Sequence, residues 1–299
     1  MTTRILSTSH GTNRAAFHSL DWALLVSAAA IWGSSFLFTA IALEAFRPGL
    51  VTLLRVGFGA LALNMWPGAR RPVERADWPR LWVVALLWVA IPLTLFPIAQ
   101  QWIASGVTGM LNGFTPVLTA VVASFLLSAL PGARQRWGLG LGLVGVAAIG
   151  LPTASQGRTA ALGVVLVLAA LLCYAFAINL VAPLQQKYGA VPVLARVVGV
   201  AVLVVAPLGG GAVQDSYFAW GPFLANFALG ALGTGAAFVA ATTLIGRVGS
   251  TRGSTLTYLI PVVALFLGIV FRDERVEAVQ VMGTALVMAG AFLTSRRER

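Results

Sequence analysis

The sequence predicts an all-α polytopic membrane protein whose ten transmembrane helices form two inverted five-helix repeats around a central cavity. Three observations support this prediction: an apolar composition, a series of long apolar runs, and an internal repeat. The chain is 59% hydrophobic and 10% charged, with a mean hydropathy of +0.89. Soluble domains carry roughly 25% charged residues. The composition therefore indicates a protein whose main solvent is lipid.

Apolar runs long enough to cross about 30 Å of hydrocarbon follow one another along the chain. The expected spans are 20–43, 48–66, 79–98, 102–128, 134–151, 160–184, 191–208, 218–242, 250–271 and 276–294. Polar or turn-forming segments separate them. The predicted organisation is a cytoplasmic tail at 1–19, a first five-helix repeat at 20–151, a linker at 152–159, a second repeat at 160–294 and a cytoplasmic tail at 295–299.

Two stretches of the chain repeat each other at a nearly constant offset. Pro116, Gly138 and Gly145 recur as Pro261, Gly283 and Gly290, each pair 145 positions apart. Ten spans divide into five plus five. Because each half then has an odd number of spans, the halves must insert upside down relative to each other, which is the layout of many secondary transporters.

The net charge of +11 follows from membrane topology. With the N-terminus in the cytoplasm, fourteen basic residues fall in inside segments and only Arg47, Arg158, Arg272 and Arg275 in outside loops, as the positive-inside rule requires. We expect a multi-pass protein of the bacterial inner membrane with both termini cytoplasmic. The expected partners are a small-molecule substrate and membrane lipids. No basic face is interleaved with aromatics, so nucleic acid is not expected, and the oligomeric state stays open, a monomer included.

The chemistry-bearing residues that are missing from the spans exclude several functions. All nine acidic residues lie at span ends, in loops or in the C-terminal tail. A carboxylate at membrane depth usually marks a proton relay or a cation site, so a proton-coupled antiporter with a central Asp or Glu is disfavoured. His10 and His18 both lie in the N-terminal tail, and Cys173 is the sole cysteine. We therefore expect no catalytic residues, no metal site and no cofactor.

Two proline-containing spans offer the clearest polar stripes. Thr108, Asn112 and Thr115 share one face of the fourth span and precede Pro116. In the ninth span, Ser254 and Tyr258 precede Pro261 in the same way. A proline removes a backbone hydrogen bond, and freed backbone is tolerated at membrane depth only where it is buried or lines a wet cavity. These residues are candidates for substrate binding. Alternatively, their hydroxyls bond only to their own helix.

The first span adds a second group of candidates. Trp32, Ser35 and Thr39 share a helix face, and Tyr174 occupies the position related to Trp32 in the second half. Aromatic residues at related sites could flank an apolar or aromatic substrate. The alternative is that they are ordinary packing residues.

Five further residues are candidates for gating or anchoring. Arg55 and Arg196 lie one to two turns inside their spans, where each can snorkel toward the nearer surface or anchor a carboxylate. Gln100, Gln101 and Trp102 follow the third span and could form an outer gate.

Several of these residues also carry a resemblance to a known family. The segment Trp32-Gly33-Ser34-Ser35-Phe36 resembles the opening signature of the drug/metabolite transporter superfamily, in its ten-span EamA family. The segment 258–264, followed by Glu274, Gln280, Gly283 and Gly290, resembles the second-half signature. The likeness covers roughly 20–294. The first half of the sequence departs from the family pattern: Ala129 and Leu130 occupy the region where a glutamate like Glu274 is common.

The resemblance implies a central cavity, alternating access and small metabolites that are usually exported. An aromatic amino acid exporter of the YddG type is the nearest expectation. We therefore expect a secondary transporter, not an enzyme, that exports amino acids and related neutral or zwitterionic metabolites by facilitated diffusion. The alternatives are a multidrug or other metabolite exporter of the same superfamily, and a non-transporting lipid-handling or scaffold protein.

Overall fold

The computed structural model describes residues 18–126 and 132–295, and every regular element within them is a helix. Eight helical segments are long and apolar enough to cross a membrane, and Pro48–Asn64 and Ala278–Thr294 are shorter apolar helices. The described part of the chain is therefore that of a polytopic membrane protein. Residues 1–17, Ala129, Leu130 and 296–299 lie outside the described residues, so what the sequence predicted for them has no counterpart here.

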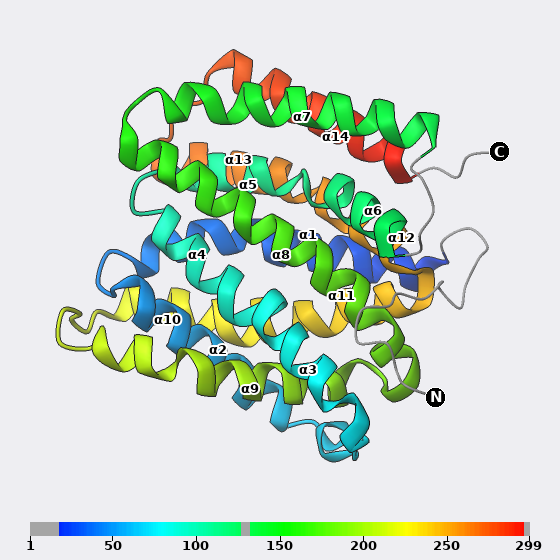
Figure 1. The fold of residues 1–299 in the computed structure, drawn as a ribbon. Coiled ribbons are helices and arrows are strands. Elements are labelled where there is room, and N and C mark those ends of the chain that lie inside the picture. The colour runs from blue at the N-terminus through cyan, green and yellow to red at the C-terminus, as the bar shows by residue number, and fades with distance from the viewer. Residues whose placement is uncertain (1–17, 127–131, 296–299) are drawn as a thin grey trace.

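Most of the spans are single helices, and four are assembled from shorter pieces (Figure 1). The single helices are α1 (Ser19–Ala42), α2 (Pro48–Asn64), α7 (Ala133–Ala154), α8 (Arg158–Tyr188), α9 (Ala190–Gly211) and α14 (Ala278–Ser295). The composite spans are α3 (Trp78–Val84) with η3 (Ala85–Ala90) and α4 (Ile91–Ala99); α5 (Ser105–Asn112) with α6 (Thr115–Leu126); α10 (Trp220–Ala228) with η4 (Leu229–Ala236) and α11 (Ala237–Val248); and α12 (Ser250–Gly253) with η5 (Ser254–Tyr258) and α13 (Ile260–Arg272). The short 3-10 turns η1 (Pro67–Arg70) and η2 (Arg75–Asp77) lie in the loop before α3.

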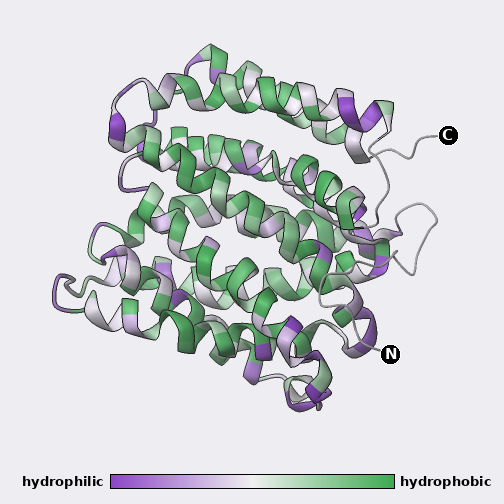
Figure 2. Ribbon diagram, viewed as in Figure 1, coloured by the Kyte–Doolittle hydropathy of each residue, from purple (hydrophilic) through white to green (hydrophobic). Residues whose placement is uncertain are grey.

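Hydrophobic residues cover the length of the helices, and hydrophilic residues gather near their ends (Figure 2). Large apolar side chains such as Leu61, Leu203 and Phe266 are exposed on the outer faces. An apolar surface of this extent is not stable in water. It is what a protein surrounded by hydrocarbon presents.

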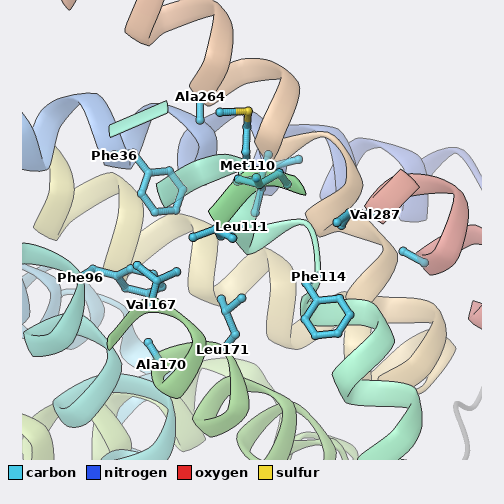
Figure 3. Packing of buried hydrophobic residues seen from close by; sticks show 14 of the residues in the cluster. Phe36, Phe96, Met110, Leu111, Phe114, Val167, Ala170, Leu171, Ala264 and Val287 are labelled. Carbon is cyan, nitrogen blue, oxygen red and sulfur yellow. The ribbon is translucent and has the colours of Figure 1, made fainter. Parts of the chain in front are cut away.

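Helices from the two halves of the chain pack against each other in related pairs. α1 packs on α13 and, correspondingly, α8 on α6, and α2 contacts α9. α7 and α14 lie side by side at one edge of the bundle (Figure 1). A central hydrophobic cluster joins α1, α4, α5 and α8 (Figure 3). Its large side chains are those of Phe36, Phe96, Leu111, Phe114 and Leu171.

The two broken spans meet directly at their breaks. Between α5 and α6 the helix is interrupted at Gly113 and Phe114, just before Pro116. In the other half, the 3-10 segment η5 precedes Pro261 at the start of α13. A Cβ on Gly113 would lie 2.7 Å from Pro261 Cγ, so only glycine permits this approach.

Glycines also set the distance between α7 and α14. A Cβ on Gly145 would lie 2.6 Å from the carbonyl oxygen of Gly283 and 2.7 Å from the backbone nitrogen of Val287. Small residues of this kind allow helix backbones in membranes to approach closely. The same helix carries Gly140, at which an added Cβ would meet nothing within 4 Å.

This difference predicts opposite outcomes for two alanine substitutions in α7. Gly145→Ala forces the two helix backbones apart, and overpacking of this kind costs about 1–3 kcal/mol of folding stability. Gly140→Ala should leave stability unchanged or raise it slightly, because alanine favours a helix over glycine. Thermal unfolding of the purified variants in detergent measures both. An equal melting temperature for the two variants would contradict the packing described here.

Candidate functional site

A cavity lies at the centre of the bundle, where α1, α2, α8 and the composite spans converge. The space between its walls, counted with the part open to solvent, is about 520 Å³. The lining residues are Trp32, Ser35, Phe36, Thr39, Arg55, Trp88, Phe96, Asn112, Thr115, Tyr174, Ile178, Phe238 and Thr257.

Six aromatic side chains form two ring clusters on the cavity walls. In one, Phe238 contacts Trp32 and Trp88, with ring centroids 5.2 Å and 5.0 Å apart. In the other, Phe96 contacts Phe36 and Tyr174, each at 5.7 Å. Edge and tilted contacts at these distances are favourable for aromatic pairs. They hold the rings in fixed orientations around the cavity.

Irregular turns carry several of the lining side chains. The composite spans around the cavity contain two π-helical segments, η3 with Trp88 and η4 with Gly233 and Thr234. Trp32 Nε1 donates a hydrogen bond to the Gly233 carbonyl oxygen at 2.9 Å, which fixes the indole against η4. π-Helical turns are rare and occur frequently at functional sites.

The break at Pro116 brings two polar residues to the cavity. Proline has no N–H, so the Asn112 carbonyl lacks its usual intrahelical partner. The single proton of the Thr115 hydroxyl is shared between that carbonyl oxygen, at 2.7 Å, and Asn112 Oδ1, at 2.8 Å. This arrangement gives the Asn112 carbonyl a hydrogen-bond donor from within the protein, and it orients the Asn112 side chain at the cavity wall.

The hydroxyls of the first span bond to their own helix. Ser35 Oγ donates to the Ile31 carbonyl oxygen at 3.0 Å, and Thr39 Oγ1 donates to the Ser35 carbonyl oxygen at 2.7 Å. Because their protons are already engaged, these hydroxyls line the cavity mainly as acceptors.

Arg55 is buried in the cavity wall instead of extending to the outer surface. Its side chain is 5% exposed, and Nε donates to Thr234 Oγ1 at 3.2 Å. A Cβ on Gly233 would lie 3.5 Å from Arg55 Nη2 and 3.2 Å from Ser35 Oγ, so the guanidinium lies against the same turn as Ser35. Of the two alternatives for Arg55, snorkelling to the surface does not occur, and anchoring a carboxylate stays a prediction.

The structure places the remaining candidate residues outside the cavity lining. Thr108 Oγ1 donates to the Ala104 carbonyl oxygen, the Tyr258 hydroxyl to Ala291 on α14, and Arg196 to the carbonyl oxygens of Ala69 and Pro192. Ser254 is fully buried elsewhere. Gln101 and Trp102 are exposed beyond α4, and the Gln100 amide atoms are buried with no hydrogen-bond partner in the described part of the chain.

Six lining residues were not predicted from the sequence: Phe36, Trp88, Phe96, Ile178, Phe238 and Thr257. Ile178 follows Tyr174 by one helical turn, and Phe36 follows Trp32 by one turn, so a wider search of those two faces would have found them. Trp88 lies inside a π-helical segment, and Phe238 is the second residue after one. The α-helical period does not predict which way such side chains point.

Within residues 18–126 and 132–295, no group of three or more His, Cys, Asp or Glu residues is arranged to hold a metal ion. The lining atoms are aromatic rings, hydroxyls, one amide and one guanidinium. The cavity chemistry therefore fits the binding of a small molecule through an apolar body and a few polar contacts.

Comparisons with known proteins identify the family and the fold. The sequence pattern of the EamA-like transporter family matches residues 22–151 and again residues 161–296. Over 278 residues the chain is 23% identical to the uncharacterized transporter YoaV of Bacillus subtilis, covering 91% of this chain and 95% of YoaV. Over 287 residues it is 26% identical to a probable terminal-alkyne amino-acid exporter of Streptantibioticus cattleyicolor, covering 92% and 93%. A solved crystal structure shares the fold, with a TM-score of 0.62 and 20% identity over 93% of this chain and 96% of that chain.

Cysteine accessibility distinguishes the cavity wall from the predicted residues that lie outside it. In a Cys173→Ala background, Thr39→Cys and Thr257→Cys should react with a small polar thiol reagent several-fold faster than Thr108→Cys, because thiol reactivity requires access to the site. The rate of labelling is read by mass spectrometry in membranes. Equal labelling at Thr108→Cys and Thr39→Cys would contradict the cavity as described.

Proposed function

The chain belongs to the EamA-like transporter family, within the drug/metabolite transporter superfamily, and is a multi-pass membrane transporter; from this premise we propose that it exports amino acids, including aromatic ones, and related small neutral or zwitterionic metabolites. Transport is by alternating access and is facilitative. The observation that carries the proposal is the central cavity, which combines two aromatic clusters with hydroxyl, amide and guanidinium groups. Such walls fit a substrate with an apolar body and a small polar end.

One relative supports the substrate class. The Streptantibioticus protein, 26% identical, is a probable exporter of an amino acid with an apolar terminal alkyne. An aromatic cavity with few polar groups would accommodate that type of molecule as well as an aromatic amino acid. The proposal for this chain is therefore a class of amino acids with apolar side chains.

The proposed architecture is two inverted five-helix repeats with boundaries at 20–151 and 160–294. The sequence pattern of the family matches the chain twice, within nearly the same limits as the two proposed repeats. Related pairs of helices pack together, and π-helical segments occur at Ala85–Ala90 and Leu229–Ala236, again about 145 positions apart. In this arrangement both termini face the cytoplasm, and the two halves rock around the cavity.

Alternating access requires closures on both sides of the cavity. On the proposed outer side, Glu274 accepts hydrogen bonds from the backbone nitrogens of Ser105 and Gly106 at 2.8 Å and 2.7 Å. On the proposed inner side, Lys187 bridges Asp77 at 2.9 Å and Glu74 at 2.8 Å. Gln100, Gln101 and Trp102 near the outer closure, and Arg196 near the inner one, remain candidates for gate contacts.

The cavity walls also favour one alternative, the export of hydrophobic drugs. Six aromatic rings would bind many apolar molecules. However, cationic drugs would meet a guanidinium and no carboxylate, which disfavours them. A non-transporting role is excluded by any substrate flux that the pure protein catalyses in liposomes.

Counterflow in proteoliposomes tests the proposed function. Vesicles loaded with unlabelled L-phenylalanine should accumulate external labelled L-phenylalanine transiently, because the carrier exchanges one for the other. Protein-free vesicles are the control, and a panel of amino acids defines the range. The absence of exchange for every amino acid tested would refute the proposal.

An imposed pH gradient should not drive uphill accumulation of the same substrates. No carboxylate or imidazole is among the cavity-lining residues, so no group there can carry a proton on each cycle. The measurement is the final ratio of internal to external substrate with and without the gradient, which should be equal. Concentrative uptake that a protonophore abolishes would contradict facilitated diffusion and would direct attention to Glu44 or Glu274.

A further inference from the structure

Arg55 is the only charged side chain among the cavity-lining residues. It lies in the middle of α2 and is 5% exposed. Its hydrogen bond from Nε to Thr234 Oγ1 uses one of the five N–H donors of a guanidinium. No acidic residue in the described part of the chain forms an ion pair with it.

The acidic residues that could neutralise Arg55 are engaged elsewhere. Asp21 pairs with Arg247 at 2.6 Å, and Glu44 pairs with Arg272. Asp77 and Glu74 pair with Lys187. Glu274 accepts from Ser105 and Gly106. A buried cation without a counter-ion at membrane depth is costly, and such residues mark binding sites or transport pathways.

Three hydroxyls near Arg55 do not compete for an incoming anion. Ser35 and Thr39 donate their hydroxyl protons to carbonyl oxygens of α1, and Thr115 donates to Asn112 across the break. The terminal Nη1 and Nη2 groups of Arg55 therefore remain the strongest donors at the cavity wall. Their planar fork matches the two oxygens of a carboxylate.

We propose that Arg55 binds the carboxylate of the substrate, so that the transported class is small monocarboxylates with an apolar or aromatic body, of which amino acids are members. This inference rests on the proposed function of the cavity as a substrate site. The aromatic clusters around Phe238 and Phe96 receive the body of the molecule. The amino group has no carboxylate to bind in the cavity lining and meets only neutral acceptors and aromatic rings there, so it contributes less to recognition than the carboxylate.

The proposal makes opposite predictions for two analogues of phenylalanine. 3-Phenylpropionate keeps the carboxylate and lacks the amine, so it should bind about as well as L-phenylalanine. L-Phenylalaninamide keeps the amine and lacks the carboxylate, so it should bind at least about tenfold more weakly, because it forfeits a charge-assisted hydrogen bond. The ratio of the two affinities does not depend on the amount of folded protein.

The experiment measures this ratio in the wild type and in three variants. Inhibition of L-phenylalanine counterflow and thermal stabilisation of the detergent-purified protein are recorded for both analogues. Arg55→Gln should reduce the preference for the carboxylate to about one, and Arg55→Lys should retain part of it because the charge remains without the fork. Arg158→Gln removes an exposed arginine at the start of α8 and should keep the wild-type ratio.

The outcomes separate this inference from the proposed function. Counterflow with equal affinities for the two analogues would overturn the role of Arg55 and leave amino acid transport intact. Stabilisation by 3-phenylpropionate that depends on Arg55, without counterflow of any amino acid, would overturn the proposed substrates and uphold carboxylate binding. A wild-type preference that persists in Arg55→Gln would assign the carboxylate to another group and refute the inference.

Discussion

The close contact between two broken helices determines the centre of this structure. Gly113, at the break between α5 and α6, lies against Pro261 at the start of α13, and Gly109 lies against Ala264 one turn away. In lipid, every backbone polar group must be satisfied within the protein. At the break before Pro116, the Thr115 hydroxyl meets this requirement for the Asn112 carbonyl. The cavity lies beside this contact, with Asn112, Thr115 and Thr257 from the two broken spans in its wall.

Much of the fold and half of the site follow from residue patterns. Apolar run lengths located the spans. Of the residues that shared helix faces singled out, six line one cavity, and their role in substrate binding stays a prediction: Trp32, Ser35, Thr39, Asn112, Thr115 and Tyr174. The errors occur where the backbone leaves the α-helical period. In η5 the chain winds as a 3-10 helix, which has three residues per turn. Thr257 therefore lines the cavity, and Tyr258 points to α14 instead.

Arg55 shows a second kind of limit. A position one to two turns inside a span allows an arginine to reach either the surface or the interior, and sequence position alone does not decide between them. The decision comes from the opposing span: Gly230 and Gly233 of η4 leave room beside α2, and Thr234 supplies an acceptor. Each of these groups is far from Arg55 in sequence. The resulting arrangement holds one positive charge among aromatic rings. We propose that the carboxylate of the substrate pairs with this charge.

The central claim is that substrate binds in this cavity with its carboxylate on Arg55. A cryo-electron microscopy structure of the full chain with L-phenylalanine tests it most directly. The account predicts ligand density between the aromatic clusters, with the carboxylate within hydrogen-bond distance of the Arg55 guanidinium. Density at another location, or in the cavity with the carboxylate turned away from Arg55, would contradict it.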